Sequence, residues 1–195
     1  MKILTWENIL VIMIIVFALY IYHTSEYANL KCIISTVDGN TYCVRERRKL
    51  ELAADKLARV NINMRKLVQH CHKKHPGRPN VRRLRDGYNP KKIYETLPTS
   101  QHTAYSENKG EKLAFCLDTE KTESKLIDMN TLTFVAIHEL AHIATESVGH
   151  TEEFWDNFKF LLQEAKKIDI CKPVDYSKKP QRYCGMTITD NPYYG

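Results

Sequence analysis

The amino-acid sequence predicts an α+β fold in which helices pack on a small mixed sheet, behind an N-terminal transmembrane helix. Three observations lead to this prediction. Apolar residues recur at helical spacing in several long segments, one of which contains the run His138-Glu139-Leu140-Ala141-His142. Short segments rich in β-branched and aromatic residues lie between them, bounded by Gly, Asn and Pro. The start of the chain is almost wholly apolar over a length that suits a membrane helix.

The N-terminal segment is predicted to cross a membrane. Ile9 to Tyr22 holds fourteen uncharged and mostly apolar residues, and counting back to Ile3 gives twenty. About 20 residues span the hydrocarbon core of a bilayer, and aromatic residues at both ends resemble interfacial anchors. A cleaved signal peptide is the alternative, but no small-x-small cleavage site follows Tyr22. We expect a single-pass membrane protein that contacts the membrane through residues 3–22. The basic residues from Arg45 to Lys49 favour a cytoplasmic position for the rest of the chain.

The remainder of the chain is long enough for one folded domain with a core. Hydrophobic residues make up 43% and charged residues 27% of the sequence, which is typical of a globular protein. Cys32 to Val37 and Thr41 to Arg45 are predicted to form a hairpin across an Asp38-Gly39 turn. The expected divisions are an anchor over 1–26, a hairpin or stalk over 27–46, and a folded domain over 47–195.

The folded domain is expected to begin with a long helix over about Arg47 to His72. Apolar residues recur there at a helical period: Leu50, Ala53, Ala54, Leu57, Val60, Met64, Leu67 and Val68. The Pro- and Gly-containing segment that follows predicts a loop. His72 and His75 lie three residues apart and could bind a metal adventitiously, but their lysine-rich surroundings are more typical of solvated residues. Short strands are expected over Val81 to Arg85, Ile93 to Thr96 and Lys112 to Leu117.

The run His138 to His142 is the most informative motif in the chain. The residues around it are mostly apolar and predict a buried helix from about Phe134 to Ala144. On a helix, residues four apart lie on one face, so both imidazoles can reach the same metal ion. Glu139 lies about 100° round the helix, close enough to hold a water at that metal without becoming a ligand. The alternative is that the histidines are hydrogen-bonded core residues, but polar groups are costly in so apolar a helix unless something pairs with them.

A third candidate ligand, His150, follows the helix. Gly149 can turn the chain sharply past a helix C-terminus, and seven residues separate His142 from His150. Glu146 and Glu153 are the alternative third ligands. Thr151 is expected to cap the next helix, whose apolar positions extend to about Lys167.

Together these residues are the parts of a zinc peptidase site. We expect zinc bound by His138, His142 and His150, with Glu139 as the general base that takes a proton from water and delivers it to the departing amine. The substrate would be a protein or peptide. A donor for the tetrahedral oxyanion is also expected, and Tyr183, Tyr193 and Tyr194 are candidates by residue type alone.

The motif and its downstream sequence resemble a known family. His-Glu-Leu-Ala-His followed by Gly149-His150-x-x-Glu153-Phe154-Trp155 is similar to the WLM and SprT-like group of zinc metallopeptidases, and most similar to uncharacterised peptidase-like proteins of large DNA viruses. The resemblance covers about Asn80 to Pro192. It implies a zincin-like fold, the same three histidine ligands and the same general base. In that fold the strand over 112–117 would border the cleft and could bind an extended substrate along its edge. The gap between the second and third histidines is longer here than in other WLM proteins.

Charge and cysteines bear on partners and location. From Arg45 to Lys92 there are 16 Lys/Arg and 4 Asp/Glu, so this basic segment, 45–92, could meet an anionic membrane or nucleic acid. The six cysteines suit disulfides in an oxidising compartment or reduced thiols in the cytosol. Cys32 and Cys43 flank the hairpin turn, and Cys171 and Cys184 could staple the Pro-rich stretch between them.

The sequence therefore favours a membrane-anchored zinc metallopeptidase. Two alternatives remain open at this point. One is a catalytically silent viral membrane or structural protein stabilised by zinc, and the other is a basic, membrane-anchored binding module in which the histidine motif is coincidental.

Overall fold

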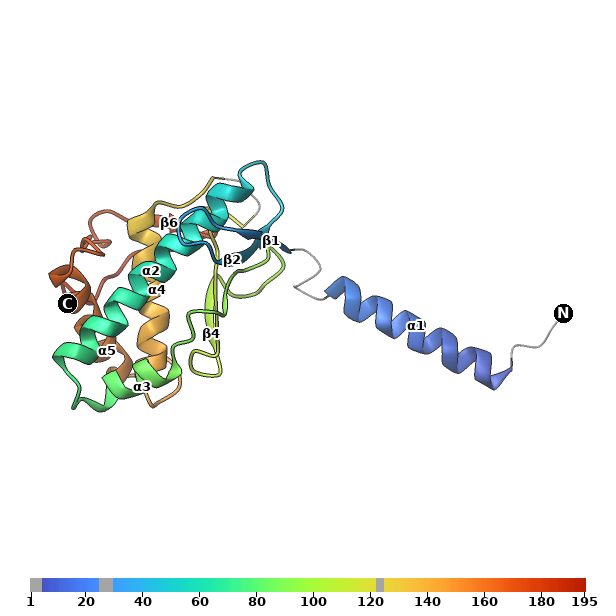
Figure 1. Ribbon diagram of the computed structural model, residues 1–195, viewed down its shortest axis with the longest axis horizontal. Helices are drawn as coiled ribbons and strands as arrows, with labels where there is room; N and C mark the ends of the chain where they lie inside the picture. The colour runs from blue at the N-terminus through green and yellow to red at the C-terminus, as the bar shows by residue number, and fades with distance from the viewer. Residues whose placement is uncertain (1–4, 25–29, 122–124) are drawn as a thin grey trace.

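The computed structural model describes residues 5–24, 30–121 and 125–195. Its first element is helix α1 (Trp6–Thr24), which stands apart from the other elements in Figure 1. Most of its apolar side chains, among them Leu10 and Phe17, are more than half exposed. The remaining helices and strands pack together around one core (Figure 1).

The prediction of a single-pass membrane protein is wrong for the part of the chain that the structure describes, because none of its helices is long and apolar enough to cross a membrane. The apolar run from Ile9 to Tyr22 is about 21 Å long at 1.5 Å per residue, whereas the hydrocarbon core is about 30 Å thick. Glu7 and Asn8 occupy the first turn of α1. Residues 3 and 4 of the predicted segment 3–22 lie outside the described residues. The prediction that the rest of the chain lies on the cytoplasmic side depended on this membrane anchor, so it loses its support as well.

A five-stranded mixed sheet forms one layer of the fold, with the strand order β1-β2-β3-β5-β4. Its strands are β1 (Leu30–Ile34), β2 (Thr41–Arg45), β3 (Ile93–Glu95), β4 (Ala104–Glu107) and β5 (Lys112–Phe115). β3 is parallel to both β2 and β5, while the β1–β2 and β4–β5 pairs are antiparallel. The small mixed sheet is thereby confirmed, and β4 lies at its edge.

Four helices and a short hairpin complete the fold. They are α2 (Leu50–Lys74), α3 (Pro79–Gly87), α4 (Met129–Ala144), α5 (Glu152–Lys167), and the hairpin strands β6 (Gln181–Tyr183) and β7 (Met186–Ile188). α2 contacts β2 on the sheet and also packs on α4, which in turn contacts α3, α5 and β4. The helix with the histidine motif is consequently central, and twelve of its sixteen residues are buried.

Most predicted elements are present, but two strand predictions need correction. The segment Val81 to Arg85 is helical, because Pro79 begins α3 and the apolar residues Val81 and Leu84 are three apart, which buries them on one helix face. The segment expected to border the cleft as an edge strand, 112–117, forms β5 in the interior of the sheet. β4, which the sequence did not predict, pairs with β5 and takes the edge position.

The cysteines form two disulfides. Cys32 and Cys43 are directly opposite in the β1–β2 hairpin and are bonded to each other. Cys184 bonds to Cys116, so the expected staple between Cys171 and Cys184 is wrong. Cys171 is a free thiol buried in the core, where the segment after α5 packs on the domain.

Candidate metal centre

Helix α4 places two of the three predicted ligands. Asp128 caps its N-terminus by accepting a hydrogen bond of 2.9 Å from the backbone N–H of Thr131. The helix then runs without a break to Ala144, so His138 and His142 lie one turn apart on the same face. Apolar neighbours on its other faces fix the helix in the core, which leaves little freedom in the direction of the two imidazoles.

The three predicted histidines come together in space. The Nε2 atom of His138 lies 3.2 Å from Nε2 of His142 and 3.1 Å from Nε2 of His150. Each residue offers one ring nitrogen, and all three nitrogens lie within 4.8 Å of one another. In a tetrahedral zinc site with bonds of about 2.0–2.1 Å, two ligand nitrogens lie about 3.3 Å apart. The spacing of the histidine nitrogens therefore fits zinc.

His150 reaches the site from the loop between α4 and α5. Gly149 in this loop has φ +88°, a left-handed conformation that favours glycine. Thr151 caps α5 as expected, and its side chain accepts a hydrogen bond from Phe154 N. Both alternative third ligands, Glu146 and Glu153, instead contact Arg83. The structure thus brings His150, and neither glutamate, beside the other histidines.

An aromatic wall from α5 encloses one side of the histidine group. The ring of Phe154 lies 4.4 Å from that of His142, centroid to centroid, and Phe158 lies 5.1 Å from His138. Trp155, which is 39% exposed, lies 5.6 Å from His150. The sequence predicted these residues only as an apolar helix face, because their contact with the histidines depends on how α5 packs on α4.

Burial keeps the two helical histidines neutral. It lowers the pKa of His138 to about 3, with additional effects from His142 and His150. It lowers the pKa of His142 to about 4, again with a contribution from His150. Neutral imidazoles have a free nitrogen lone pair at neutral pH, which is the form that binds a metal.

Glu139 lies beside the histidines on the wall of the same cleft. Its side chain is buried, and burial raises its pKa to about 8. Tyr183 is also buried at this cleft, and both burial and the nearby Glu139 raise its pKa. Of the three predicted oxyanion donors, Tyr183 lines the cleft, whereas Tyr193 and Tyr194 contact Lys166 and Pro173 elsewhere.

The cleft has a volume of about 670 Å³ and is bounded by segments from several parts of the chain. They are α4, α5, the loop that ends at His150, the edge strand β4 with the two residues before it and Lys109 after it, and the β6–β7 hairpin with the residues after it. The walls are largely apolar, with Phe134, Val135, Met186 and Ile188 among them. An extended peptide is the shape that such a cleft, bordered by an edge strand, accommodates.

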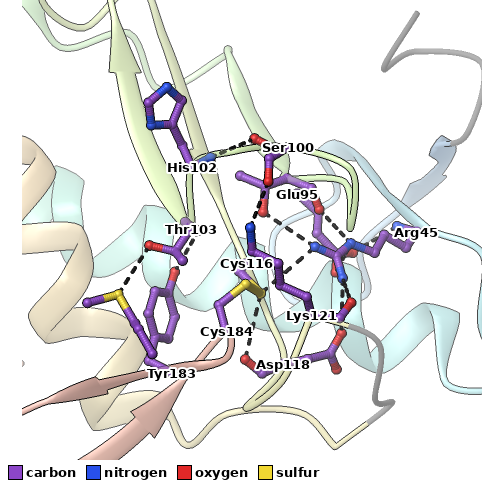
Figure 2. The surroundings of a disulfide bond; sticks show 12 residues. Arg45, Glu95, Ser100, His102, Thr103, Cys116, Asp118, Lys121, Tyr183 and Cys184 are labelled. Atoms are coloured by element: carbon purple, nitrogen blue, oxygen red, sulfur yellow. Dashed lines mark hydrogen bonds and ion pairs between the residues drawn. A yellow bond between two sulfur atoms is a disulfide. The ribbon is translucent and has the colours of Figure 1, made fainter. Parts of the chain in front are cut away.

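The β6–β7 wall is fixed to the sheet by a disulfide and by hydrogen bonds (Figure 2). Tyr183 Oη donates to the carbonyl oxygen of Thr103 over 3.2 Å, and the N–H of Cys184 donates to Asp118 O over 3.0 Å. Figure 2 shows the bond between Cys116 and Cys184 close to this contact. The β6–β7 hairpin, near the C-terminus, is therefore held in a fixed position at the cleft.

Two arginines of the basic segment 45–92 are buried in ion pairs instead of facing solvent. Arg45 and Arg47 each contact Glu95 and Asp118, next to the disulfide (Figure 2 shows Arg45). Burial raises the pKa of Glu95 to about 7, and Arg47 opposes this shift. These cations are not available to phosphate groups, so the possible nucleic-acid partner gains no support from them.

Of the other two histidines that the sequence singled out, His72 and His75, the second lies near the carboxylate of Glu164, together with His70. His70 Nε2 lies 2.8 Å from Glu164 Oε2, and His75 Nε2 lies 3.4 Å from the same oxygen. Among the residues that the structure describes, only the group at His138, His142 and His150 brings together three ligand atoms suited to a metal.

Comparisons with known proteins identify one family and several relatives. The family model described as the WLM domain matches residues 85–192, which is 108 of the 195 residues. An uncharacterized protein of Acanthamoeba polyphaga mimivirus is 28% identical over 188 residues, covering 94% of this chain and 95% of its own. An uncharacterized protein of Invertebrate iridescent virus 6 is 31% identical over 67 residues, covering 34% and 38%. The crystal structure of Wss1 from Saccharomyces cerevisiae aligns with a TM-score of 0.40 and 15% identity, over 62% of this chain and 78% of Wss1.

Proposed function

Because this chain belongs to the WLM family of metallopeptidases, we propose that it is a zinc-dependent enzyme that hydrolyses peptide bonds in protein substrates. The observation that carries the proposal is the convergence of three imidazole nitrogens at the wall of an open cleft. A catalytic zinc site has three protein ligands and leaves one coordination position for water or substrate. His138, His142 and His150 would hold the metal.

Zinc, when bound, supplies a Lewis acid that polarises the scissile carbonyl, acidifies the attacking water and favours the ionised form of a nearby carboxylic acid. Glu139 is the group placed to handle the proton. It follows His138 on the helix, it lines the cleft, and none of the described cations pairs with it. A carboxylate in this position takes a proton from the water molecule as that water attacks the carbonyl carbon.

The same carboxyl group completes the reaction. When the C–N bond breaks, Glu139 returns the proton to the departing nitrogen, so that one water molecule and one peptide bond give a carboxylic acid and an amine. The buried surroundings of Glu139 keep bulk water from competing for this proton. The aromatic wall of Phe154 and Phe158 has the same effect on the metal side.

The cleft supports an extended, unfolded or flexible segment as the substrate. β4 lies at the edge of the sheet and lines the cleft, and we infer that a substrate strand pairs along this edge. Apolar residues from α4 and β7 line the space opposite and would accept apolar side chains. A folded protein surface presents few such segments, so cleavage is expected at loops and unfolded regions.

Turnover by the purified full-length chain, loaded with zinc, tests this proposal on an unfolded protein such as reduced casein. The wild type should cleave it, and removal of zinc by a chelator should abolish cleavage until zinc is restored. A Glu139→Gln variant should keep zinc but lose cleavage, and Glu152→Gln, which makes the same change at an exposed carboxylate nearby, is its matched control and should retain full activity. A zinc-loaded wild type that cleaves no protein or peptide would contradict the proposal.

A further inference from the structure

The loop over residues 145–150, which carries His150, is held by charged side chains more than by repeating backbone hydrogen bonds. Lys109 contacts it from one side. Its Nζ donates to the carbonyl oxygens of Thr145 and Ser147 over 2.8 and 2.9 Å, and to that of His142 over 3.3 Å. The last carbonyls of a helix have no partner within the helix, and a cation at this end is favourable. Lys109 thus satisfies acceptors on both the helix end and the loop.

Glu153 holds the same loop from the other side. Its Oε1 accepts the N–H of Glu146 over 3.0 Å, and its Oε2 accepts the N–H of Ser147 over 3.1 Å and the hydroxyl of Ser147 over 2.8 Å. Arg83 fixes the carboxylate by donating to Oε1 over 2.9 Å, and donates to the carbonyl of Ala144 over 2.8 Å. Because two consecutive N–H groups of the loop donate to the same carboxylate, the loop has little conformational freedom.

The turn that carries Lys109 is itself held in an unusual conformation. Lys109 has φ +55° and the neighbouring Asn108 has φ +47°, in the left-handed region where residues other than glycine are uncommon. The following Gly110 lies so close to Gly87 that an added Cβ would be 2.4 Å from the Gly87 carbonyl oxygen. Such a conformation persists when the surroundings impose it, and it is often found next to functional sites. Here it directs Lys109 towards the loop.

We propose that Lys109 and Glu153 are positioning residues of the metal site, which hold the loop over 145–150 so that His150 stands beside His138 and His142 before the metal binds. This inference rests on the proposed zinc site. His138 and His142 are positioned by a buried helix, whereas His150 is exposed and depends on its loop. A ligand fixed in advance loses less conformational entropy when zinc binds. Removing the contacts made by Lys109 or Glu153 should therefore weaken zinc binding.

The test compares zinc affinity in the full-length chain, measured by competition with a chromophoric chelator. Lys109→Met and Glu153→Gln should each weaken zinc binding by about 10- to 100-fold, the range typical of groups that orient metal ligands. Two control variants make the same chemical changes at exposed positions, Lys91→Met and Glu152→Gln. They should bind zinc within about twofold of the wild type.

A second comparison separates positioning of His150 from a general effect on the fold. In a His150→Ala background, Lys109→Met should change zinc affinity by no more than about twofold, because the residue through which it acts has been removed. An equal loss in both backgrounds would assign Lys109 to overall stability and overturn the inference. Unchanged zinc affinity in both Lys109→Met and Glu153→Gln would overturn it as well.

Amide hydrogen exchange in the metal-free protein gives a readout that does not need zinc. Glu153→Gln should speed exchange at the N–H groups of Glu146 and Ser147 by roughly tenfold, with no change in the core of α2. If the wild type bound no zinc, the proposed function would fail and the positioning role with it, but this exchange measurement would still decide whether Glu153 holds the loop. Unchanged exchange at the two amides would show that the loop is held by other contacts.

Discussion

Two glycines beside the candidate metal centre adopt left-handed conformations in different surroundings. Gly110 has φ +106°, and a Cβ added there would lie 2.4 Å from the Gly87 carbonyl oxygen and 2.8 Å from the side chain of Ile143. Gly149 has φ +88°, but a Cβ added there would meet only open space. The first position therefore requires glycine for both space and conformation, and the second for conformation alone.

Alanine at these two glycines should destabilise the protein to different extents. We expect Gly110→Ala to lower the free energy of unfolding by about 2–4 kcal/mol, because a backbone clash adds to the conformational strain. Gly149→Ala should lower it by about 1 kcal/mol, the cost of a left-handed alanine. Unfolding in urea, followed by circular dichroism, measures both values. Equal losses would contradict the close packing of the Lys109 turn on α3.

At the scale of elements, the junction of α4 and α5 should be sensitive to acid through Glu153. Hydrogen bonds from the N–H groups of Glu146 and Ser147 lower the pKa of Glu153 to about 2, below its ordinary value near 4.5. A carboxyl group with a lowered pKa in the folded state stabilises the protein above its unfolded pKa, and this contribution is lost as the pH falls towards the folded value. The loss is expected between about pH 5 and pH 2.

The comparison of wild type with Glu153→Gln isolates this effect. The variant should be less stable at neutral pH, because a neutral amide oxygen is a weaker acceptor for the loop N–H groups. The difference between the two urea midpoints should shrink as the pH is lowered towards 2. A difference that stays constant from pH 7 to pH 3 would mean that the charge on Glu153 does not hold the loop.

A comparison of the helices and strands with the sequence shows which parts of the fold could be predicted. The long helix α2 and the pair α4 and α5 were predictable, because apolar periodicity over many residues and a capping residue such as Thr151 mark them. α3 was mistaken for a strand, because nine residues are too few to separate the two periods. β4, β6 and β7 have three or four residues each and exist through pairing with partners, which a local pattern does not reveal.

The candidate site, like the fold, could be predicted from the sequence only in part. His138, Glu139 and His142 follow from spacing on one helix, and His150 follows from its place just after Gly149, although the helix itself ends earlier, at Ala144. Lys109 could not be found from sequence, because it is 33 residues from His142 and meets the loop only through the β4–β5 turn. The residues Asn108-Lys109-Gly110 are typical of a turn, but the contact of this turn with the end of α4 depends on tertiary packing.

At the scale of the whole molecule, the cleft is assembled from segments that are far apart in the chain. The centres of the edge strand β4, the helix α4 and the hairpin strand β7 lie about 30 to 80 residues from one another in sequence, so their contacts are long-range. The disulfide between Cys116 and Cys184, 68 residues apart, links the sheet to the β6–β7 wall. The chain must therefore complete its fold before the cleft exists, although the histidine motif itself is local.

The whole-molecule view also separates the domain from its N-terminal helix. The apolar residues of α1 are exposed and stand away from the core, while the core is formed by the sheet and the four later helices (Figure 1). The hairpin β1–β2, expected within a separate stalk over 27–46, is part of the five-stranded sheet. Among the described residues, those that form the candidate metal site and line its cleft all come after position 100.

The most direct test of the account is the zinc content of the purified full-length chain beside its His150→Ala and Glu139→Gln variants, measured by atomic emission after dialysis. The account predicts one zinc per chain in the wild type and in Glu139→Gln, with zinc lost or weakly held in His150→Ala. This pattern would assign His150 as a ligand and Glu139 as a group outside the metal shell. A folded wild type without zinc, or a His150→Ala variant that keeps it as tightly, would contradict the three-histidine site.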